Sequence, residues 1–279
     1  MNKIIKLCAI AATSLTLNTT YAAEFSLPQA SSFYPIYNSG KNQYIPPTTD
    51  MPFDQISTLY IAFAHAYPQG NAAVLDFEHG QDQEQARLKD LIQIARKMNP
   101  NIKFIISLGW GYQFNDWGHI NDDYESGANQ FPNSVVQFIR ENDLDGFDID
   151  DESVTGISQA NFDAVVKNIR IALNNASVTD NKAYYFTITP AFGLANVNRN
   201  NKDNFDMINV QNYGGSSAGY FINIGVDPSK ISVGIDSEGC HAYFPDNTGL
   251  AGIFNWTLSA DSNCGDYKYT HQIAHKVGY

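Results

Sequence analysis

The chain has 279 residues, of which 43% are hydrophobic, 13% aromatic and 16% charged, and its formal net charge is −12. This acidic balance argues against nucleic acid and anionic membranes as partners and suits a neutral substrate. The length is sufficient for one large core, including that of a barrel.

The N-terminal stretch has the layout of a secretory signal peptide. Two lysines precede an apolar run at residues 7–17, which is too short to span a bilayer, and small residues then lead to Ala22. We therefore predict a signal peptide over residues 1–22, with a buried N-terminal helix as the alternative. Residues 23–279 would then form one exported domain of net charge −14, secreted or periplasmic. No later segment suits a membrane span, so no membrane contact is expected after cleavage.

Eight short apolar runs, rich in β-branched and aromatic residues, predict buried strands. They cover residues 33–37, 58–64, 103–108, 146–150, 185–189, 207–210, 231–235 and 252–256.

Helical periodicity lies between several of these runs, around residues 88–95, 135–139 and 162–173, the last after a cap at Ser158. This alternation predicts an α/β fold with a mainly parallel sheet. Eight strands at this length favour a single-domain (β/α)8 TIM barrel over a doubly wound sheet. The short gaps in the second half predict short or missing helices there. Chemistry is expected where the strands end.

The fourth run carries a row of acids. Asp148, Asp150 and Glu152 are spaced by two, so they share one face of a strand, while Phe147 and Ile149 face the helices. Neighbouring carboxylates cannot all ionise easily, and the raised pKa that results is what a general acid needs. An acidic surface strand does not fit the apolar neighbours, and a calcium site would need more oxygen ligands from a loop. No metal ion and no cofactor are expected.

The acids also match a known signature. Asp145, Gly146, Asp148, Asp150 and Glu152 occupy every fixed position of D-G-x-D-x-D-x-E. The chain thereby resembles glycoside hydrolase family 18, which includes chitinases and endo-β-N-acetylglucosaminidases.

Three other segments resemble that family in order and separation. Residues 107–111 resemble its S-x-G-G segment, with Trp110 in place of the second glycine. Residues 207–213 resemble the sixth-strand motif, and residues 252–256 resemble the last strand. The resemblance covers essentially all of residues 23–279.

The resemblance implies a retaining, substrate-assisted mechanism. Glu152 would protonate the glycosidic oxygen, and the 2-acetamido oxygen of the substrate would attack the anomeric carbon. Asp150 would orient the acetamido N–H, Asp148 would share a proton or hydrogen bond with Asp150, and Tyr213 would donate to the acetamido carbonyl.

The resemblance also implies a set of sugar contacts. Trp256 would stack under the bound sugar, with a core tryptophan as the alternative, and Gln211 would make a polar contact. Trp110 would form a subsite, with loop packing as the alternative. Asp145 belongs to the signature, so we group it with the substrate-binding residues. Its position at the start of the strand, however, favours a structural role.

Two of the three cysteines remain after the signal peptide is removed. Cys240 and Cys264 would then lie in an oxidising compartment, so we expect a disulfide between them. Two free buried thiols are the alternative.

Three functions fit these features. We favour a chitinase that cleaves internal β-1,4 bonds of N-acetylglucosamine polymers; the short second-half gaps favour a shallow groove and endo action. The alternative is an endo-β-N-acetylglucosaminidase acting on N-glycans, because Asp151 before Glu152 resembles several glycan-cleaving members. A silent lectin on the same fold is the third reading, although such relatives usually lose the terminal Glu. The protein is expected to be a monomer whose partner is a carbohydrate.

Overall fold

The computed structural model describes residues 24–39, 42–77, 81–110, 112–152, 154–192 and 196–279. The predicted signal peptide, residues 1–22, lies outside the described residues. Among those that are described, no helix has both the length and the apolar character needed to cross a membrane.

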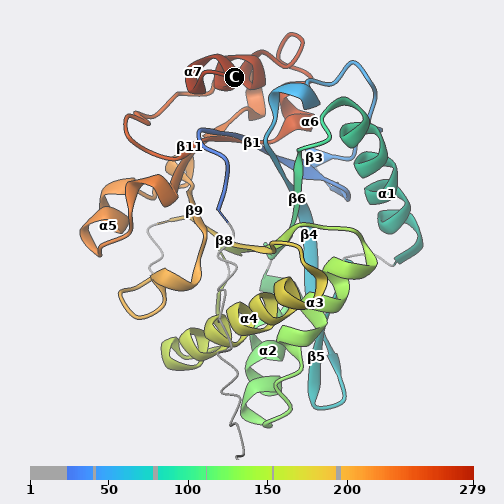
Figure 1. Cartoon of the computed structure of the whole chain (residues 1–279), viewed down its shortest axis with the longest axis vertical. Helices are drawn as coiled ribbons and strands as arrows, with labels where there is room; N and C mark the ends of the chain where they lie inside the picture. Colours follow the sequence, from blue (N-terminus) through green and yellow to red (C-terminus); the bar gives the residue numbers. More distant parts are fainter. Residues whose placement is uncertain (1–23, 40–41, 78–80, 111, 153, 193–195) are drawn as a thin grey trace, which may run out of the picture.

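A closed parallel barrel forms the centre of the molecule (Figure 1). Within the described residues, each of its eight strands pairs in parallel with the next, and β1 pairs with both β11 and β4, which closes the ring. The barrel strands are β1 (Gln29–Pro35), β4 (Thr58–Gln69), β6 (Lys103–Leu108), β7 (Gly146–Asp151), β8 (Tyr185–Pro190), β9 (Met207–Val210), β10 (Ile231–Asp236) and β11 (Gly252–Trp256). The α/β barrel predicted from the eight apolar runs is confirmed.

The first strand differs from its predicted range of 33–37, because it begins at Gln29 and ends at Pro35. Three of its first four residues, Gln29, Ser31 and Ser32, are polar, so hydrophobicity gives little signal for them. The structure shows why they can be buried: the Gln29 side-chain oxygen accepts hydrogen bonds from the hydroxyls of Ser57 and Thr58, each over 2.9 Å.

The helices confirm the predicted asymmetry between the two halves. The first half carries α1 (Gln81–Met98), α2 (Asp116–Glu125), α3 (Phe131–Glu141) and α4 (Gln159–Asp180). The described part of the second half carries α5 (Ala218–Asn223), α6 (Leu258–Asp261) and α7 (Lys268–Val277), which are shorter. The hydroxyl of Ser158 caps α4 by accepting from the backbone N–H of Asn161, as the sequence predicts.

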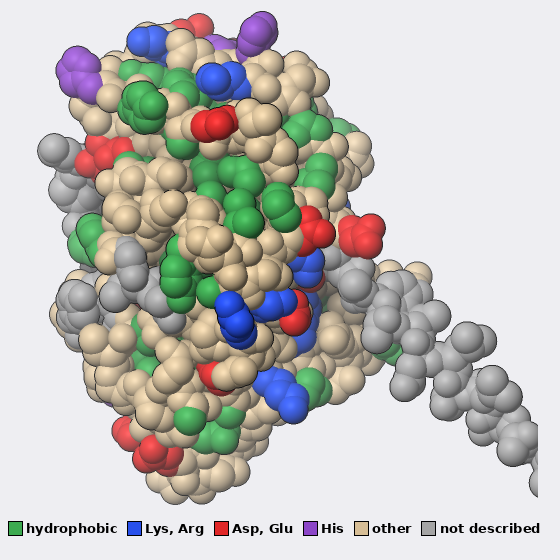
Figure 2. All heavy atoms as spheres, turned by 90° about the vertical axis from the view of Figure 1, so that its left-hand side faces the viewer, with side chains coloured by type: hydrophobic (Ala, Val, Ile, Leu, Met, Phe, Trp, Pro, Cys, Tyr) green, Lys and Arg blue, Asp and Glu red, His purple; other side chains and the backbone are tan. Residues whose placement is uncertain are grey.

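The remaining elements are small. Strand β5 (Ala72–Phe77) pairs antiparallel with the extended end of β4, and β2 (Asn38–Ser39) forms a hairpin with β3 (Asn42–Gln43). Short 3-10 helices are η1 (Phe53–Gln55), η2 (Tyr112–Phe114), η3 (Lys202–Asn204), η4 (Asn212–Gly214), η5 (Pro228–Lys230) and η6 (Glu238–Cys240). On the face drawn in Figure 2, acidic and basic side chains are interspersed with apolar ones.

Two apolar layers hold the barrel together. Inside it, aromatic rings such as Phe33 and Tyr60 stack with centroids 5.0 Å apart. Outside it, Phe147 stacks on Phe186 at 5.9 Å and contacts Phe131 of α3 edge to face. Each such burial contributes roughly 1.5–3 kcal/mol. Because Phe147 faces the helices, its neighbour Asp148 must face the inside of the barrel.

Candidate active site

Asp148 lies deepest in the barrel and is completely buried. Its carboxylate accepts hydrogen bonds from Ser107 Oγ (2.7 Å), Thr187 Oγ1 (2.5 Å) and Thr189 Oγ1 (3.0 Å). Burial raises its pKa to about 6, and the three hydroxyl donors limit that rise. Near neutral pH, this carboxyl can therefore hold or release a proton.

Asp150 is also buried and accepts a hydrogen bond from Gln211 Nε2 over 2.9 Å. Burial, and after it the negative charges of Glu152, Asp148 and Asp151, raise its pKa well above the usual value, and the Gln211 amide opposes that rise. Glu152 follows the end of β7 and is partly exposed. Burial also raises its pKa, and Gln211 lowers it. The structure thus brings the three predicted acids together, with Gln211 beside two of them.

The glycine of the third-strand motif makes room for this acid strand. Gly109 has a φ of +134°, and a Cβ placed on it would lie 2.9 Å from the backbone oxygen of Asp150 and 3.1 Å from its Cβ. Any other residue would push β6 away from β7 at the level of the acids.

Tyr213 lies just after β9, in η4, on the same side as the acids. Its residue is 38% exposed, yet its pKa is raised, first by burial and then by the charges of Asp150 and Glu152. We read this as a ring with one edge in solvent and its hydroxyl among the acids. The ring fits only because residue 234 is glycine: a Cβ there would lie 2.7 Å from Tyr213 Cε1.

Trp256 ends β11 and is partly buried, so it is neither a pure core residue nor a surface one. Its indole stacks with Phe63 at 5.9 Å and contacts Phe33 at 5.3 Å. Its Nε1 donates to Glu238 Oε1 over 3.2 Å. The inner aromatic layer and Glu238 together fix the orientation of the indole at the mouth of the barrel.

A pocket of about 400 Å³ opens beside Tyr213, and its lining includes Asp236, Glu238, His241 and Tyr243. A larger hollow of about 800 Å³ lies between α1 and α3, and none of the acids of β7 lines it. The acids of β7 do not line the smaller pocket either, but Tyr213 does, and the charges of Asp150 and Glu152 act on Tyr213, so we place the site beside the smaller pocket. Asp236 and Glu238 were not predicted as site residues, although their position at the end of the seventh apolar run is a signal for such a role.

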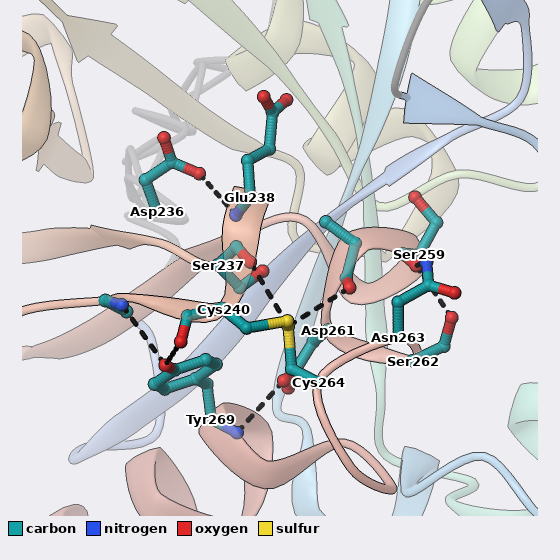
Figure 3. The surroundings of a disulfide bond; sticks show 12 residues. Asp236, Ser237, Glu238, Cys240, Ser259, Asp261, Ser262, Asn263, Cys264 and Tyr269 are labelled. Carbon is teal, nitrogen blue, oxygen red and sulfur yellow. Dashed lines mark hydrogen bonds between the residues drawn. A yellow bond between two sulfur atoms is a disulfide. The ribbon is translucent and has the colours of Figure 1, made fainter.

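The disulfide between Cys240 and Cys264 is present, with an S–S distance of 2.06 Å and Cα atoms 5.2 Å apart, so the free-thiol alternative is wrong. Figure 3 shows that it joins the segment carrying Asp236 and Glu238 to the segment after α6. Asp236 Oδ1 also accepts from the backbone N–H of Glu238 over 2.7 Å. Covalent and hydrogen bonds thus hold this wall of the pocket.

Asp145 lies at the opposite end of β7 from Glu152, away from the acid row, and makes its contacts there. It precedes β7, where Oδ2 accepts from the backbone N–H of Phe104 over 3.0 Å and Oδ1 lies 3.0 Å from Lys182 Nζ. Seven residues of extended chain place it roughly 20 Å from Glu152. Its role is to tie the beginnings of two strands together.

Trp110 and Asp151 lie beside the acid row. Trp110 follows β6, is 39% exposed and has a φ of +35°. Asp151 points to the outer side of β7, where it is fully buried and accepts from Asn196 Nδ2 over 2.6 Å. Burial raises its pKa to about 7. Its Oδ2 has no hydrogen-bond partner among the described residues.

Comparison with known proteins assigns the chain to a family. A family model described as glycosyl hydrolases family 18 matches residues 33–242. Among solved structures, a mutant class V chitinase from Nicotiana tobaccum in complex with NAG4 is 15% identical, with 88% of this chain and 98% of that chain covered and a TM-score of 0.65.

Two further solved structures are similar. The chitinase-like agglutinin from Robinia pseudoacacia is 17% identical, with 88% and 99% covered and a TM-score of 0.68. A family 18 N-acetylglucosaminidase from Paenibacillus barengoltzii is 16% identical, with 87% and 98% covered and a TM-score of 0.65. At these identities the likeness shows the barrel fold, while chemistry must be argued from the site itself.

Proposed function

The chain belongs to glycosyl hydrolases family 18, and from this premise we propose that it is an endo-acting chitinase that hydrolyses β-1,4 bonds of N-acetylglucosamine polymers. The observation that carries the proposal is the row of Asp148, Asp150 and Glu152 on one inner face of β7, each with a raised pKa. The Nicotiana neighbour, solved with NAG4, supports the substrate class.

In the first step Glu152 donates its proton to the glycosidic oxygen, and the leaving sugar departs. The carbonyl oxygen of the substrate's own 2-acetamido group attacks the anomeric carbon and forms an oxazolinium ring. Asp150 accepts a hydrogen bond from the acetamido N–H and balances the positive charge that develops on the oxazolinium ring. Tyr213 donates to the acetamido carbonyl. In the second step, water adds to the anomeric carbon, Glu152 takes its proton, and the ring opens with retained configuration.

Asp148 assists these two reaction steps by sharing a proton with Asp150. Its pKa of about 6 and its three hydroxyl donors allow it to exist in either state near neutral pH. When Asp148 is protonated, Asp150 can carry the negative charge that the oxazolinium ring requires. Gln211 supports the same state, because it donates to Asp150.

Asp151 is the residue that favours N-glycan cleavage in the sequence. That residue is buried on the outer side of β7 and bonded to Asn196, so it faces away from the acid row and from the substrate. It therefore holds a loop rather than selecting a glycan. This leaves chitin oligomers as the substrate that we favour.

Product analysis by mass spectrometry on chitohexaose and on a high-mannose glycoprotein tests the proposal. A chitinase cuts chitohexaose into shorter oligomers and leaves the glycoprotein intact. Release of the glycan with one N-acetylglucosamine left on the protein would instead identify an endo-β-N-acetylglucosaminidase. Binding of chitohexaose without any cleavage would identify a lectin.

We also propose that the protein is exported, secreted or periplasmic, and monomeric. The disulfide supports export, because such bonds persist in oxidising compartments. Cell fractionation with N-terminal sequencing of the mature chain tests this, and a new N-terminus at residue 23 is the expected result.

A further inference from the structure

Asp151, the residue directly before Glu152, holds the loop that follows β8. At the start of this loop, the backbone N–H of Ala191 donates to the carbonyl of Asp151 over 3.3 Å. Further along, the side-chain amide of Asn196 donates to the Asp151 carboxyl over 2.6 Å. Asp151 therefore fixes the loop at two points, once through its backbone and once through its side chain.

The same loop contacts the residue that follows Tyr213. The backbone N–H of Phe192 donates to the carbonyl of Gly214 over 2.5 Å. The two segments also pack closely, because a Cβ placed on Gly214 would lie 3.2 Å from the Cβ of Ala191. The position of Tyr213 in η4 is thus coupled to the position of the loop after β8.

Asn196 is itself held in place by residues outside the barrel. Its backbone carbonyl accepts from Asn201 Nδ2 over 2.7 Å and from Gln159 Nε2 over 3.1 Å. Asn201 Nδ2 also donates to Asp163 Oδ1 of α4 over 2.7 Å. These bonds fix Asn196 before it meets Asp151, and a side chain supported in this way positions its partner precisely.

We propose that Asp151 is a positioning residue for the reaction: together with Asn196 it holds the loop after β8, and through that loop it keeps Tyr213 aligned with Glu152. This inference rests on the proposed function. Tyr213 follows β9, and β8 separates that strand from β7, so the loop after β8 lies between the two segments in strand order. Groups that act on one substrate atom tolerate displacements of only about 0.5 Å, which explains why a buried strap is placed there.

A double-mutant cycle tests whether the strap acts through Tyr213. Asn196→Ala removes the amide that holds the Asp151 carboxyl, and it should lower kcat/KM for a fluorogenic chitobioside by about 3- to 10-fold, the size of one hydrogen bond. Tyr213→Phe removes the hydroxyl that the loop positions. In the Tyr213→Phe background, Asn196→Ala should cause no further loss, because both changes affect one interaction. Losses that multiply, or no loss in Asn196→Ala alone, overturn the proposal.

Variants of Asp151 test the strap from its other side. Asp151→Asn keeps an oxygen that accepts from the Asn196 amide, so kcat/KM should stay near the wild-type value. Asp151→Ala has no such oxygen and should lose as much as Asn196→Ala. Equal losses in Asp151→Asn and Asp151→Ala would contradict the proposal, because the hydrogen bond would then not be the feature that matters.

A matched control separates the strap from general effects on the fold. Asn168→Ala removes another side-chain amide contact of α4, made to Asn129 Oδ1 over 3.0 Å, and should keep wild-type kcat/KM. If the wild-type protein does not cleave the chitobioside, the proposed function fails instead. The same cycle, measured on the dissociation constant of chitohexaose, then still decides whether Asn196 acts through Tyr213.

Discussion

The side-chain amide of Gln211 donates to Asp150 Oδ1 over 2.9 Å, although β8 separates the strands that carry the two residues. Burial and like charges raise the pKa of Asp150, and the amide opposes that rise for both Asp150 and Glu152. One neutral donor that lies about 60 residues further along the chain thus lowers the pKa of two neighbouring carboxyls.

Replacing Gln211 by leucine removes this donor and should raise the pKa of both carboxyls further. Asp150 must be ionised and Glu152 protonated for the first step, so both limbs of the pH profile should move to higher pH. The pH dependence of kcat/KM on chitohexaose measures this. We also expect the maximum to fall by about 10-fold, since Asp150 loses a positioning contact. A shift to lower pH would contradict the assignment.

Glu152→Gln should lower kcat by about 100- to 10,000-fold, because the amide cannot donate a proton to the glycosidic oxygen. Turnover of a fluorogenic chitobioside measures the loss, and circular dichroism with thermal unfolding checks that the fold is intact. Glu141→Gln on the exposed end of α3 is the matched control and should keep full activity. Retained activity in Glu152→Gln would remove it as the proton donor.

A thiazoline analogue of the oxazolinium intermediate should inhibit competitively, since Asp150 and Tyr213 are placed to hold the acetamido-derived ring. Asp150→Ala should weaken this inhibition by about 10-fold or more, because the ring N–H loses a charged acceptor. Inhibition constants from steady-state kinetics test both statements. If the analogue does not bind to the wild-type protein, substrate assistance is refuted.

Stability should fall as the pH rises because of Asp151. Its pKa is raised from 3.8 to about 7 in the folded protein, so folding favours the protonated form. The contribution of Asp151 to the free energy of unfolding is fully present below pH 4. It is lost as the pH rises through 7, and the total loss is about 4 kcal/mol. Urea unfolding from pH 4 to 8 measures this, and Asp151→Asn should lessen the slope, while the raised pKa values of Asp148 and Asp150 keep part of it. The exposed Asp122→Asn should leave it steep.

The disulfide closes a segment with a sequence separation of 24, so Cys240→Ser with Cys264→Ser should destabilise the protein by about 3 kcal/mol. In the mature wild-type protein, alkylation should add mass only after the disulfide has been reduced, and mass spectrometry detects this. We also expect KM for chitohexaose to rise, because Glu238, which holds the Trp256 indole, lies next to the stapled segment. An unchanged KM would show that the pocket wall keeps its shape without the bond.

Local sequence patterns were enough to predict the strands and the acid row. Strand residues alternate between faces with a period of two, so the spacing of Asp148, Asp150 and Glu152 predicts a shared face wherever the strand lies. The same alternation assigns Phe147 to the helices, and the structure agrees. The polar start of β1 and the antiparallel strand β5 were missed, because their burial and pairing depend on contacts distant in the sequence.

The composition of the mouth was decided only by the tertiary structure. Phe192, Glu238 and Gln211 follow different strands, and no local pattern says which strand ends converge until β1 pairs with both β4 and β11 and closes the ring. The same closure separates Asp145 from Glu152, although both belong to one signature, because an extended strand places its two ends at opposite sides of the barrel. Residue spacing along a strand is a local property, whereas convergence between strands depends on the closed sheet.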